Sequence, residues 1–306
     1  EAATTGSIKV LTGSTNGEYD RDHRRSAYVE SGRIGADAPD EAWYEEIRKD
    51  VVTSNWGKLL PEGHGMAYAE AVIQGYVDRS AQYGRTIDQA YKDLRNDIHQ
   101  WGNAVQLATV WSALGADAYL YSYDWYAENP DGSRATHGSD RQALFPAAPG
   151  GVPEEMGKAM RNAWASFILY GDPNRNNPYF TAKGIEWKPY DHEAGNFMVF
   201  DETIRTDANR RVEDVESILP LYAEYPHIRN LLDRDARVAI ETGTYVGVHD
   251  PDTNTVSWKG IQYAHAPRFQ APVPLPASNR VYYAHKHGKN SAGAASGDPD
   301  VLNLAI

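Results

Sequence analysis

Apolar side chains recur at a helical spacing in several parts of the chain. From Ile87 to Trp101 they return at every third or fourth position, which is the spacing of a helix that buries one face. This pattern predicts a helix over residues 87–114. The same reasoning predicts further helices over residues 41–53, 67–80 and 154–169.

Shorter segments between these helices have the pattern of strands. In residues 117–125, three tyrosines stand at every second position, which is the period of a strand. Apolar runs predict two more strands, one at residues 8–11, closed by Gly13 and a polar turn, and one at residues 197–200. Because strands and helices alternate, the pattern predicts an α/β architecture for this part of the chain.

The character of the sequence changes in the last quarter of the chain. Short β-type segments, such as residues 244–248 and 255–258, alternate with turns, and four prolines crowd the stretch that follows. This change predicts a boundary at residues 227–237, which separates a first part, residues 1–226, from a second part, residues 238–306.

Length and composition are those of a folded globular protein. The chain has 306 residues, which corresponds to one large domain or two ordinary ones. Hydrophobic residues make up 41% and charged residues 24%, so disorder and fibrous repeats are excluded. No apolar run approaches the roughly 18 residues that a membrane-spanning helix needs.

The balance of charges and the lack of cysteine argue against several kinds of function. Lys and Arg number 30 against 42 Asp and Glu, a net charge of −12, and such a surface repels nucleic acid and anionic membranes. Without cysteine, disulfides, thiol nucleophiles and thiolate metal sites are excluded, while the compartment stays open. Residue 1 is Glu rather than Met and no signal-peptide pattern precedes it, so we expect a processed or trimmed chain.

Two patterns resemble metal sites, and each has a simpler interpretation. His285 and His287 lie on one side of the chain if it is extended, but no third ligand is near, which favours a solvated basic turn. Asp250, Asp252 and Asn254 are spaced like the start of a calcium loop. The glycine and the bidentate glutamate of such a loop are missing, which favours a polar hairpin turn.

Two loop residues have side chains suited to acid–base chemistry. Glu18 follows the turn after the first predicted strand, and His137 lies in the loop after the tyrosine-rich strand. Each one alone is interpreted most simply as a solvated loop residue. Together, a carboxylate and an imidazole on loops of one sheet could form the base half of a nucleophilic triad, in which the carboxylate orients the imidazole. Their spacing alone does not establish this arrangement.

Several motifs of the first part resemble those of the type-B carboxylesterases, the cholinesterase-like branch of the α/β-hydrolases. Residues 13–18 (GSTNGE) are similar to the loop in which a glycine precedes the acidic triad member by five positions. Residues 137–140 (HGSD) resemble the catalytic-histidine motif, and residues 171–174 (GDPN) resemble the end of a late helix. The resemblance implies an α/β-hydrolase fold, an acid role for Glu18, a base role for His137, and no metal or organic cofactor.

Motifs of the second part resemble the opposite end of the same family. Residues 258–264 (WKGIQYA) are similar to its first hairpin, usually FKGIPYA, although Gln262 stands where the family has proline. Residues 268–269 (RF) and 302–304 (LNL) resemble segments that follow this hairpin. The two halves therefore stand in reversed order relative to the family, which implies a circular permutation with its joint at residues 227–237.

The family's middle section, which carries the oxyanion loop and the nucleophile, has no counterpart in the sequence. No Gly-x-Ser-x-Gly motif occurs, and the His-Gly pairs at His64, His137 and His287 lack a following run of glycines. The resemblance thus implies an α/β-hydrolase fold that is incomplete in this chain and completed by a partner polypeptide, with residues 1–226 and 238–306 in one domain. That second polypeptide would carry the serine, the substrate would be a small-molecule carboxylic ester, and this chain alone would be inactive.

Three other interpretations stay open. A catalytically inactive cholinesterase-like adhesion or scaffold protein would keep the fold and lose the triad, and the retention of Glu18 and His137 counts against it. The reversed order could be an artefact of how the chain was assembled or trimmed. A ligand-binding module could use the Tyr- and Trp-rich surface, although aromatic residues, 11% of the chain, are more often in the core. The sequence indicates neither the physiological ester nor the compartment.

Overall fold

The chain forms two compact units. The computed structural model describes residues 8–59, 66–126, 133–145, 151–218, 235–250, 253–265, 270–284 and 301–304. The larger unit comprises Val10–Thr109 and Ala118–Glu224, and the smaller unit comprises Glu1–Lys9, Val110–Asp117 and Tyr225–Ile306. Within the described ranges, no helix is both long enough and apolar enough to cross a membrane.

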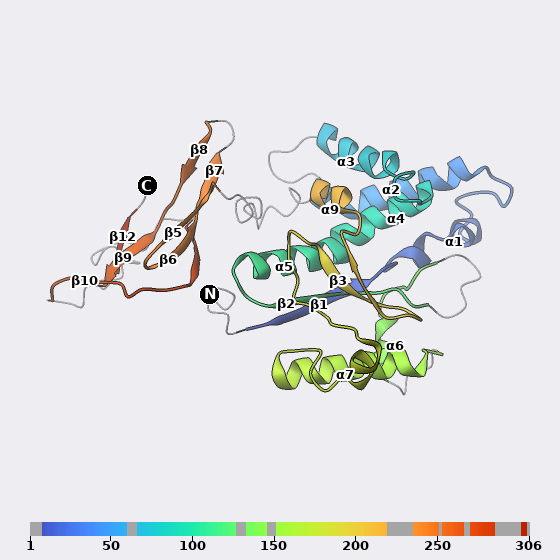
Figure 1. Ribbon diagram of the computed structural model, residues 1–306. Helices are drawn as coiled ribbons and strands as arrows, with labels where there is room; N and C mark the ends of the chain where they lie inside the picture. The colour runs from blue at the N-terminus through green and yellow to red at the C-terminus, as the bar shows by residue number, and fades with distance from the viewer. Residues whose placement is uncertain are drawn as a thin grey trace. The chain divides into compact units, whose positions relative to one another are not determined.

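A four-stranded sheet lies at the core of the larger unit (Figure 1). In spatial order its strands are β1 (Val10–Thr15), β2 (Ala118–Tyr123), β3 (Asn196–Phe200) and β4 (Arg205–Ala208). Strands β1, β2 and β3 run parallel, and β4 is antiparallel to β3. Because parallel neighbours need crossover connections, the chain passes over the faces of the sheet between them.

Helices make these connections, with α4 on one side of the sheet and α7 on the other (Figure 1). Between β1 and β2 lie the 3-10 helix η1 (Asp20–His23), α1 (Arg25–Glu30), α2 (Asp40–Leu59), α3 (Met66–Asp78), α4 (Ile87–Asn96), the π-helical turn η2 (Asp97–Trp101) and α5 (Gly102–Ala113). Between β2 and β3 lie α6 (Asp140–Leu144), α7 (Glu154–Tyr170) and α8 (Pro178–Lys183), and α9 (Val212–Ile218) follows β4.

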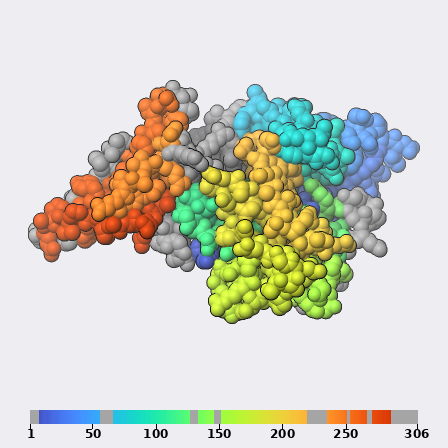
Figure 2. All heavy atoms as spheres, in the orientation of Figure 1, coloured from blue at the N-terminus to red at the C-terminus, as the bar shows by residue number. Residues whose placement is uncertain are grey.

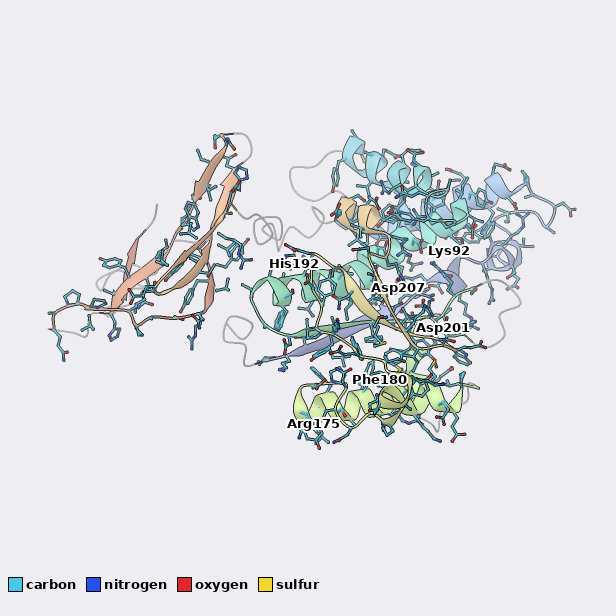
Figure 3. All side chains as sticks on the ribbon, in the orientation of Figure 1. Lys92, Arg175, Phe180, His192, Asp201 and Asp207 are labelled. Carbon is cyan, nitrogen blue, oxygen red and sulfur yellow. The ribbon has the colours of Figure 1, made fainter. Side chains whose placement is uncertain are left out.

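Aromatic side chains fill the core between the sheet and α7. The rings of Tyr121 on β2 and Trp164 on α7 pack edge to face with centroids 5.0 Å apart, and Trp187 packs against both. Phe180 of α8 is buried on the same side of the sheet (Figure 3). Every residue of β2 is buried, as expected for a parallel strand with neighbours on both sides and helices on both faces.

A second core lies among the helices on the other side of the sheet. Buried aliphatic residues of α2, α3 and α4, among them Ile47, Ile73 and Leu94, form one cluster with Ile218 of α9. In the space-filling view, α9 lies directly beside α3 (Figure 2), where the hydroxyl of Tyr68 donates to the carbonyl of Ser217 at 3.2 Å. The segment after β4 is thereby held against the helices that precede β2.

The four predicted helices lie where the apolar spacing places them, whereas the shorter helices α1, α6, α8 and α9 were not predicted. Residues 87–114 form α4, η2 and α5 in continuous succession, and residues 154–169 form α7. Helix α4 starts with a capping box, in which the Thr86 N–H donates to Gln89 Oε1 at 3.1 Å. Helix α7 ends at Gly171, whose φ of 67° requires the left-handed conformation that glycine adopts without strain.

The first strand differs from its prediction. It starts at Val10 rather than residue 8, and it continues through Gly13 to Thr15 instead of closing at Gly13. A Cβ at position 13 would lie against the carbonyl oxygen and ring of Tyr121, closer than van der Waals contact allows. The glycine therefore serves the close approach of β1 and β2 rather than a turn.

The smaller unit consists mainly of short strands in three sheets. One sheet has the order β10-β9-β12, one has the order β11-β6-β5, and β7 pairs with β8. The strands are β5 (Arg237–Ile240), β6 (Gly243–Val246), β7 (Val248–Asp250), β8 (Thr255–Ser257), β9 (Ile261–His265), β10 (Val273–Pro274), β11 (Val281–Tyr283) and β12 (Val301–Leu304).

The polar turn between β7 and β8 is part of a hairpin. Asp250 pairs with Thr255 in antiparallel register, as the hairpin interpretation of this segment predicts. Asp252 lies outside the described residues, as do His285 and His287. The predicted strand at residues 244–248 is interrupted at Gly247, where a Cβ would lie 2.7 Å from the Ser257 carbonyl oxygen.

The predicted boundary at residues 227–237 falls largely on residues outside the described ranges. The compact units divide at Glu224 and Tyr225, and the smaller unit also includes Val110–Asp117 from the end of α5 and the turn after it. The placement of residues 1–226 and 238–306 in one hydrolase domain stays a prediction.

Candidate active site

Glu18 lies in the acid loop, residues 16–20, directly after the carboxyl end of β1. Its side chain is only 7% exposed. Oε1 accepts a hydrogen bond from the backbone N–H of Thr15, the last residue of β1, at 3.0 Å. This bond ties the carboxylate to the end of the strand and leaves Oε2 to face the neighbouring loop.

His137 lies in the histidine loop, residues 133–139, which follows β2. Because β1 and β2 are parallel neighbours, their carboxyl ends open at the same edge of the sheet. The backbone N–H of His137 donates to the carbonyl of Glu18 at 3.1 Å. The imidazole is 74% exposed, in contrast to the buried carboxylate beside it.

The two side chains form a hydrogen bond, with His137 Nδ1 2.6 Å from Glu18 Oε2. An ionised carboxylate can only accept, so this contact places the proton of a neutral imidazole on Nδ1 and the free lone pair on Nε2. No residue in the described part of the chain bonds to Nε2. The arrangement is therefore suited to an imidazole that takes a proton through Nε2 from a group outside it.

Asp140 adds a second carboxyl group next to this pair. The hydroxyl of Tyr121 donates to Asp140 Oδ2 at 3.1 Å. Burial raises the pKa of Asp140, the bond from Tyr121 partly opposes this rise, and the charge of Glu18 adds to it. Burial also raises the pKa of Tyr121, so the phenol stays neutral and keeps its donor.

Buried ion pairs connect both loops to α4. Arg134 of the histidine loop binds Asp20 of the acid loop through Nε and Nη2, at 2.9 Å each, and binds Asp93 of α4 through Nη1 at 2.6 Å. Asp93 also pairs with Arg211 at 3.1 Å and Arg85 at 2.9 Å. Burial alone would raise the pKa of Asp93, but these three guanidinium groups together lower it to about 2.

Two carboxylates next to the pair, those of Asp20 and Asp93, are bound by Arg134. Among the described residues, no group of three or more His, Asp or Glu side chains could hold a metal ion. His285 and His287, for which the sequence favours a solvated basic turn, lie outside those residues.

Sequence reasoning selected Glu18 and His137 as candidates, and the structure brings these two residues together. Sequence reasoning did not select Arg134, Asp20 or Asp93. Arg134 lies 114 positions from Asp20 and 41 from Asp93. No local motif marks which carboxylate a given arginine meets over such distances. A partial signal is Gly17, because a glycine next to a functional residue often permits a close approach of backbone and side chains.

The sequence is similar to a known protein family. The family model described as "Carboxylesterase family" matches residues 4–217, a segment that includes the sheet β1–β4 and both Glu18 and His137. No curated protein matches the sequence. The match extends over more than half of the 306 residues. The chain therefore belongs to the carboxylesterase family, whose fold is that of the α/β-hydrolases and whose reaction is the hydrolysis of carboxylic esters.

Proposed function

We propose that this chain contributes the acid and the base of a serine carboxylesterase, with a second polypeptide supplying the serine and the oxyanion hole. The observation that carries the proposal is the 2.6 Å contact between Glu18 Oε2 and His137 Nδ1, with the imidazole otherwise exposed. A buried carboxylate bonded to Nδ1 of an accessible imidazole is the arrangement that a Ser-His-Glu triad requires of these two members.

In the proposed reaction, the serine hydroxyl attacks the carbonyl carbon of the ester while His137 Nε2 takes its proton. The Glu18 carboxylate keeps the imidazole in the required tautomer and stabilises the imidazolium that forms. His137 then donates this proton to the leaving alcohol, and the alkoxide never has to depart unprotonated. Water, deprotonated in turn by His137, releases the acid from the serine in the second half of the reaction.

The sequence supports a serine from outside these 306 residues. No Gly-x-Ser-x-Gly motif occurs in them. The segments that resemble the beginning of the family follow the family match instead of preceding it. The hairpin-like segment contains β9, the LNL segment lies in β12, and these two strands pair as neighbours. This order supports the proposed circular permutation.

The proposal implies that the chain alone does not hydrolyse esters. It lacks the nucleophile, and the backbone donors that would stabilise the oxyanion belong to the proposed second polypeptide. Removal of one such donor from a serine hydrolase typically costs about 3–4 kcal/mol of transition-state stabilisation. Loss of the whole oxyanion hole together with the serine leaves no measurable pathway.

A serine-directed fluorophosphonate tests the proposal on the protein purified with everything that accompanies it. We expect label on a Gly-x-Ser-x-Gly serine outside residues 1–306 and none on a serine within them. Labelling should be lost in His137→Gln and kept in His265→Gln, which changes an exposed histidine of β9. Label on a serine of this chain contradicts the second-polypeptide proposal, and no label at all favours the inactive adhesion or scaffold alternative.

A further inference from the structure

We infer that Arg134 positions the Glu18–His137 pair, so that this chain holds the pair ready-made before any nucleophile arrives. Arg134 touches neither of the two side chains, and it acts by holding the acid loop and the histidine loop in one arrangement. The catalytic consequence of this role rests on the proposed function. The structural consequence is measured without ester hydrolysis.

Arg134 meets Asp20 through three hydrogen bonds. Nε and Nη2 each donate to one carboxylate oxygen at 2.9 Å, and the backbone N–H of Arg134 donates to Oδ2 at 3.0 Å. A two-pronged contact of this kind fixes the direction of both partners as well as their distance. Asp20 stands two positions after Glu18, and Arg134 stands three positions before His137, so the contact lies next to the pair in both loops.

Backbone hydrogen bonds join the same two loops. The Gly17 N–H donates to the Ala135 carbonyl at 2.9 Å, and the Ala135 N–H donates to Asn16 Oδ1 at 3.1 Å. Together with the bond from the His137 N–H to the Glu18 carbonyl, they align the loops along their length. The bidentate contact between the side chains of Arg134 and Asp20 adds a side-chain link to these backbone bonds.

Gly17 lies directly against the Arg134–Asp20 contact. A Cβ at this position would be 2.6 Å from Cβ of Arg134 and 2.9 Å from Cγ of Asp20, closer than real side-chain atoms pack. The backbone of Gly17 does not have a positive φ, so the requirement for glycine here is one of space rather than of conformation. Any larger residue would push the two charged side chains apart.

Asp93 fixes the arrangement to the helix layer. Its side chain is 2% exposed, and its oxygens receive guanidinium groups from Arg134, Arg211 and Arg85. Three positive partners on one buried carboxylate keep it ionised, as its lowered pKa shows. Arg134 is therefore held between α4 and the acid loop, and the histidine loop cannot shift without breaking charged contacts to both.

Alkylation of His137 by iodoacetamide in the isolated chain measures whether Glu18 still holds the imidazole through Nδ1. The chain has no cysteine to consume the reagent. While Glu18 holds Nδ1, the reagent reaches only Nε2. After proteolytic digestion, mass spectrometry with isomer standards separates peptides alkylated at Nδ1 from peptides alkylated at Nε2. Loss of a hydrogen bond to a charged group, by the usual strength of such bonds, should raise the ratio of Nδ1 to Nε2 product about tenfold or more. The variant Glu18→Ala gives the product ratio expected when this hydrogen bond is absent.

Two independent variants test Arg134. In Arg134→Gln the contact to Asp20 is lost, and in Gly17→Ala all charges remain while the contact is forced apart. We expect both to raise the Nδ1 product as Glu18→Ala does. Arg210→Gln, which breaks a similarly buried pair with Asp124, should keep the wild-type ratio. If Arg134→Gln does not fold, the positioning role is tested with Gly17→Ala and with the double variant Arg134→Gln/Asp20→Asn, which leaves the net charge unchanged.

The result that overturns the inference is a wild-type product ratio in folded Gly17→Ala and in the folded Arg134 variant. In the assembled esterase, the same variants should lower kcat about 100-fold with little change in KM, since a small displacement of a catalytic group has an effect of that size. Arg134→Lys should not restore the rate, because an ammonium cannot make the bidentate contact. Failure of the proposed function would abolish only this second readout, which keeps the two failures distinguishable.

Discussion

At the scale of single residues, His23 is a buried titratable group away from the site. The residue is 2% exposed, and its Nε2 lies 2.6 Å from Nη1 of Arg95, which can only donate. Nδ1 therefore carries the proton and bonds to the Tyr28 hydroxyl at 2.8 Å, and that hydroxyl donates to Asp50 at 2.9 Å. Burial, with the charge of Arg95, lowers the pKa of His23 to about 4.

This pKa predicts a pH-dependent contribution of His23 to stability. The unfolded chain binds the proton more tightly, so the contribution is complete above pH 6.5 and is lost as the pH falls towards 4. We expect the difference in free energy of unfolding between wild type and His23→Gln to shrink by about 3 kcal/mol over this range. Urea denaturation at a series of pH values measures it. A difference that does not change with pH contradicts the buried neutral imidazole.

The comparison with His23→Gln is needed because a second group titrates with the opposite sign. Burial, opposed in part by Arg211, raises the pKa of Asp97 to about 6. The folded protein therefore binds that proton more tightly and gains stability as the pH falls below 6. Asp97 is present in both proteins, so its contribution largely cancels in the difference.

Among the residues of the site, those with a local motif could be predicted and those without one could not. Glu18 and His137 each stand in a short segment, GSTNGE and HGSD, that resembles one of a known family. Arg134 stands in no such segment, and its meaning depends on Asp20, 114 positions away. Which arginine meets which carboxylate is decided by the packing of the loops on α4, and a residue type alone contains no information on that packing.

At the scale of elements, the contact of β1 with β2 decides where the acid loop starts. The two strands pair from Val10 with Ala118 to Thr15 with Tyr123. Ser14 and Thr15 are buried at the end of β1, and Glu18 follows three residues later. A shift of β1 along β2 would move the carboxylate relative to His137, so the register of this pair is part of the site.

The substitution Gly13→Ala tests this contact. Its Cβ would overlap the backbone and ring of Tyr121, and overpacking of this kind typically costs about 1–3 kcal/mol of stability. Gly35→Ala is the matched control, because no atom lies within 4 Å of its added Cβ, and it should change stability by less than about 0.5 kcal/mol. Chemical denaturation measures both variants. Equal stability of the two contradicts the close packing of β1 on β2.

Elements with a long periodic pattern could be predicted and the end of β1 could not. The apolar period from Ile87 to Trp101 predicts a helix over residues 87–114, where α4, η2 and α5 follow one another. At residues 13–17 the run Gly-Ser-Thr-Asn-Gly has the composition of a turn. The strand nevertheless continues to Thr15, because pairing with β2 and the space beside Tyr121 outweigh local preference.

At the scale of the whole molecule, the family match and the two compact units do not have the same extent. The match ends at residue 217, and the smaller unit gathers Val110–Asp117 with residues from Tyr225 onward. The change to short β-type segments and prolines along the sequence locates the second part of the chain. It contains no information on the short segment from the first part that belongs to the same unit. Such grouping arises from contacts between distant residues, such as Arg237 with the Ala113 carbonyl at 3.3 Å.

We propose that His137, oriented by Glu18, is the general base of a serine esterase. The most direct measurement is the rate of hydrolysis of a simple aryl ester by the assembled enzyme with His137→Ala in this chain, beside His265→Ala as a control. We expect kcat to fall on the order of 10⁴-fold or more for His137→Ala with folding intact, and to stay unchanged for the control. A folded His137→Ala enzyme that retains the wild-type rate would contradict the role of His137 as the base.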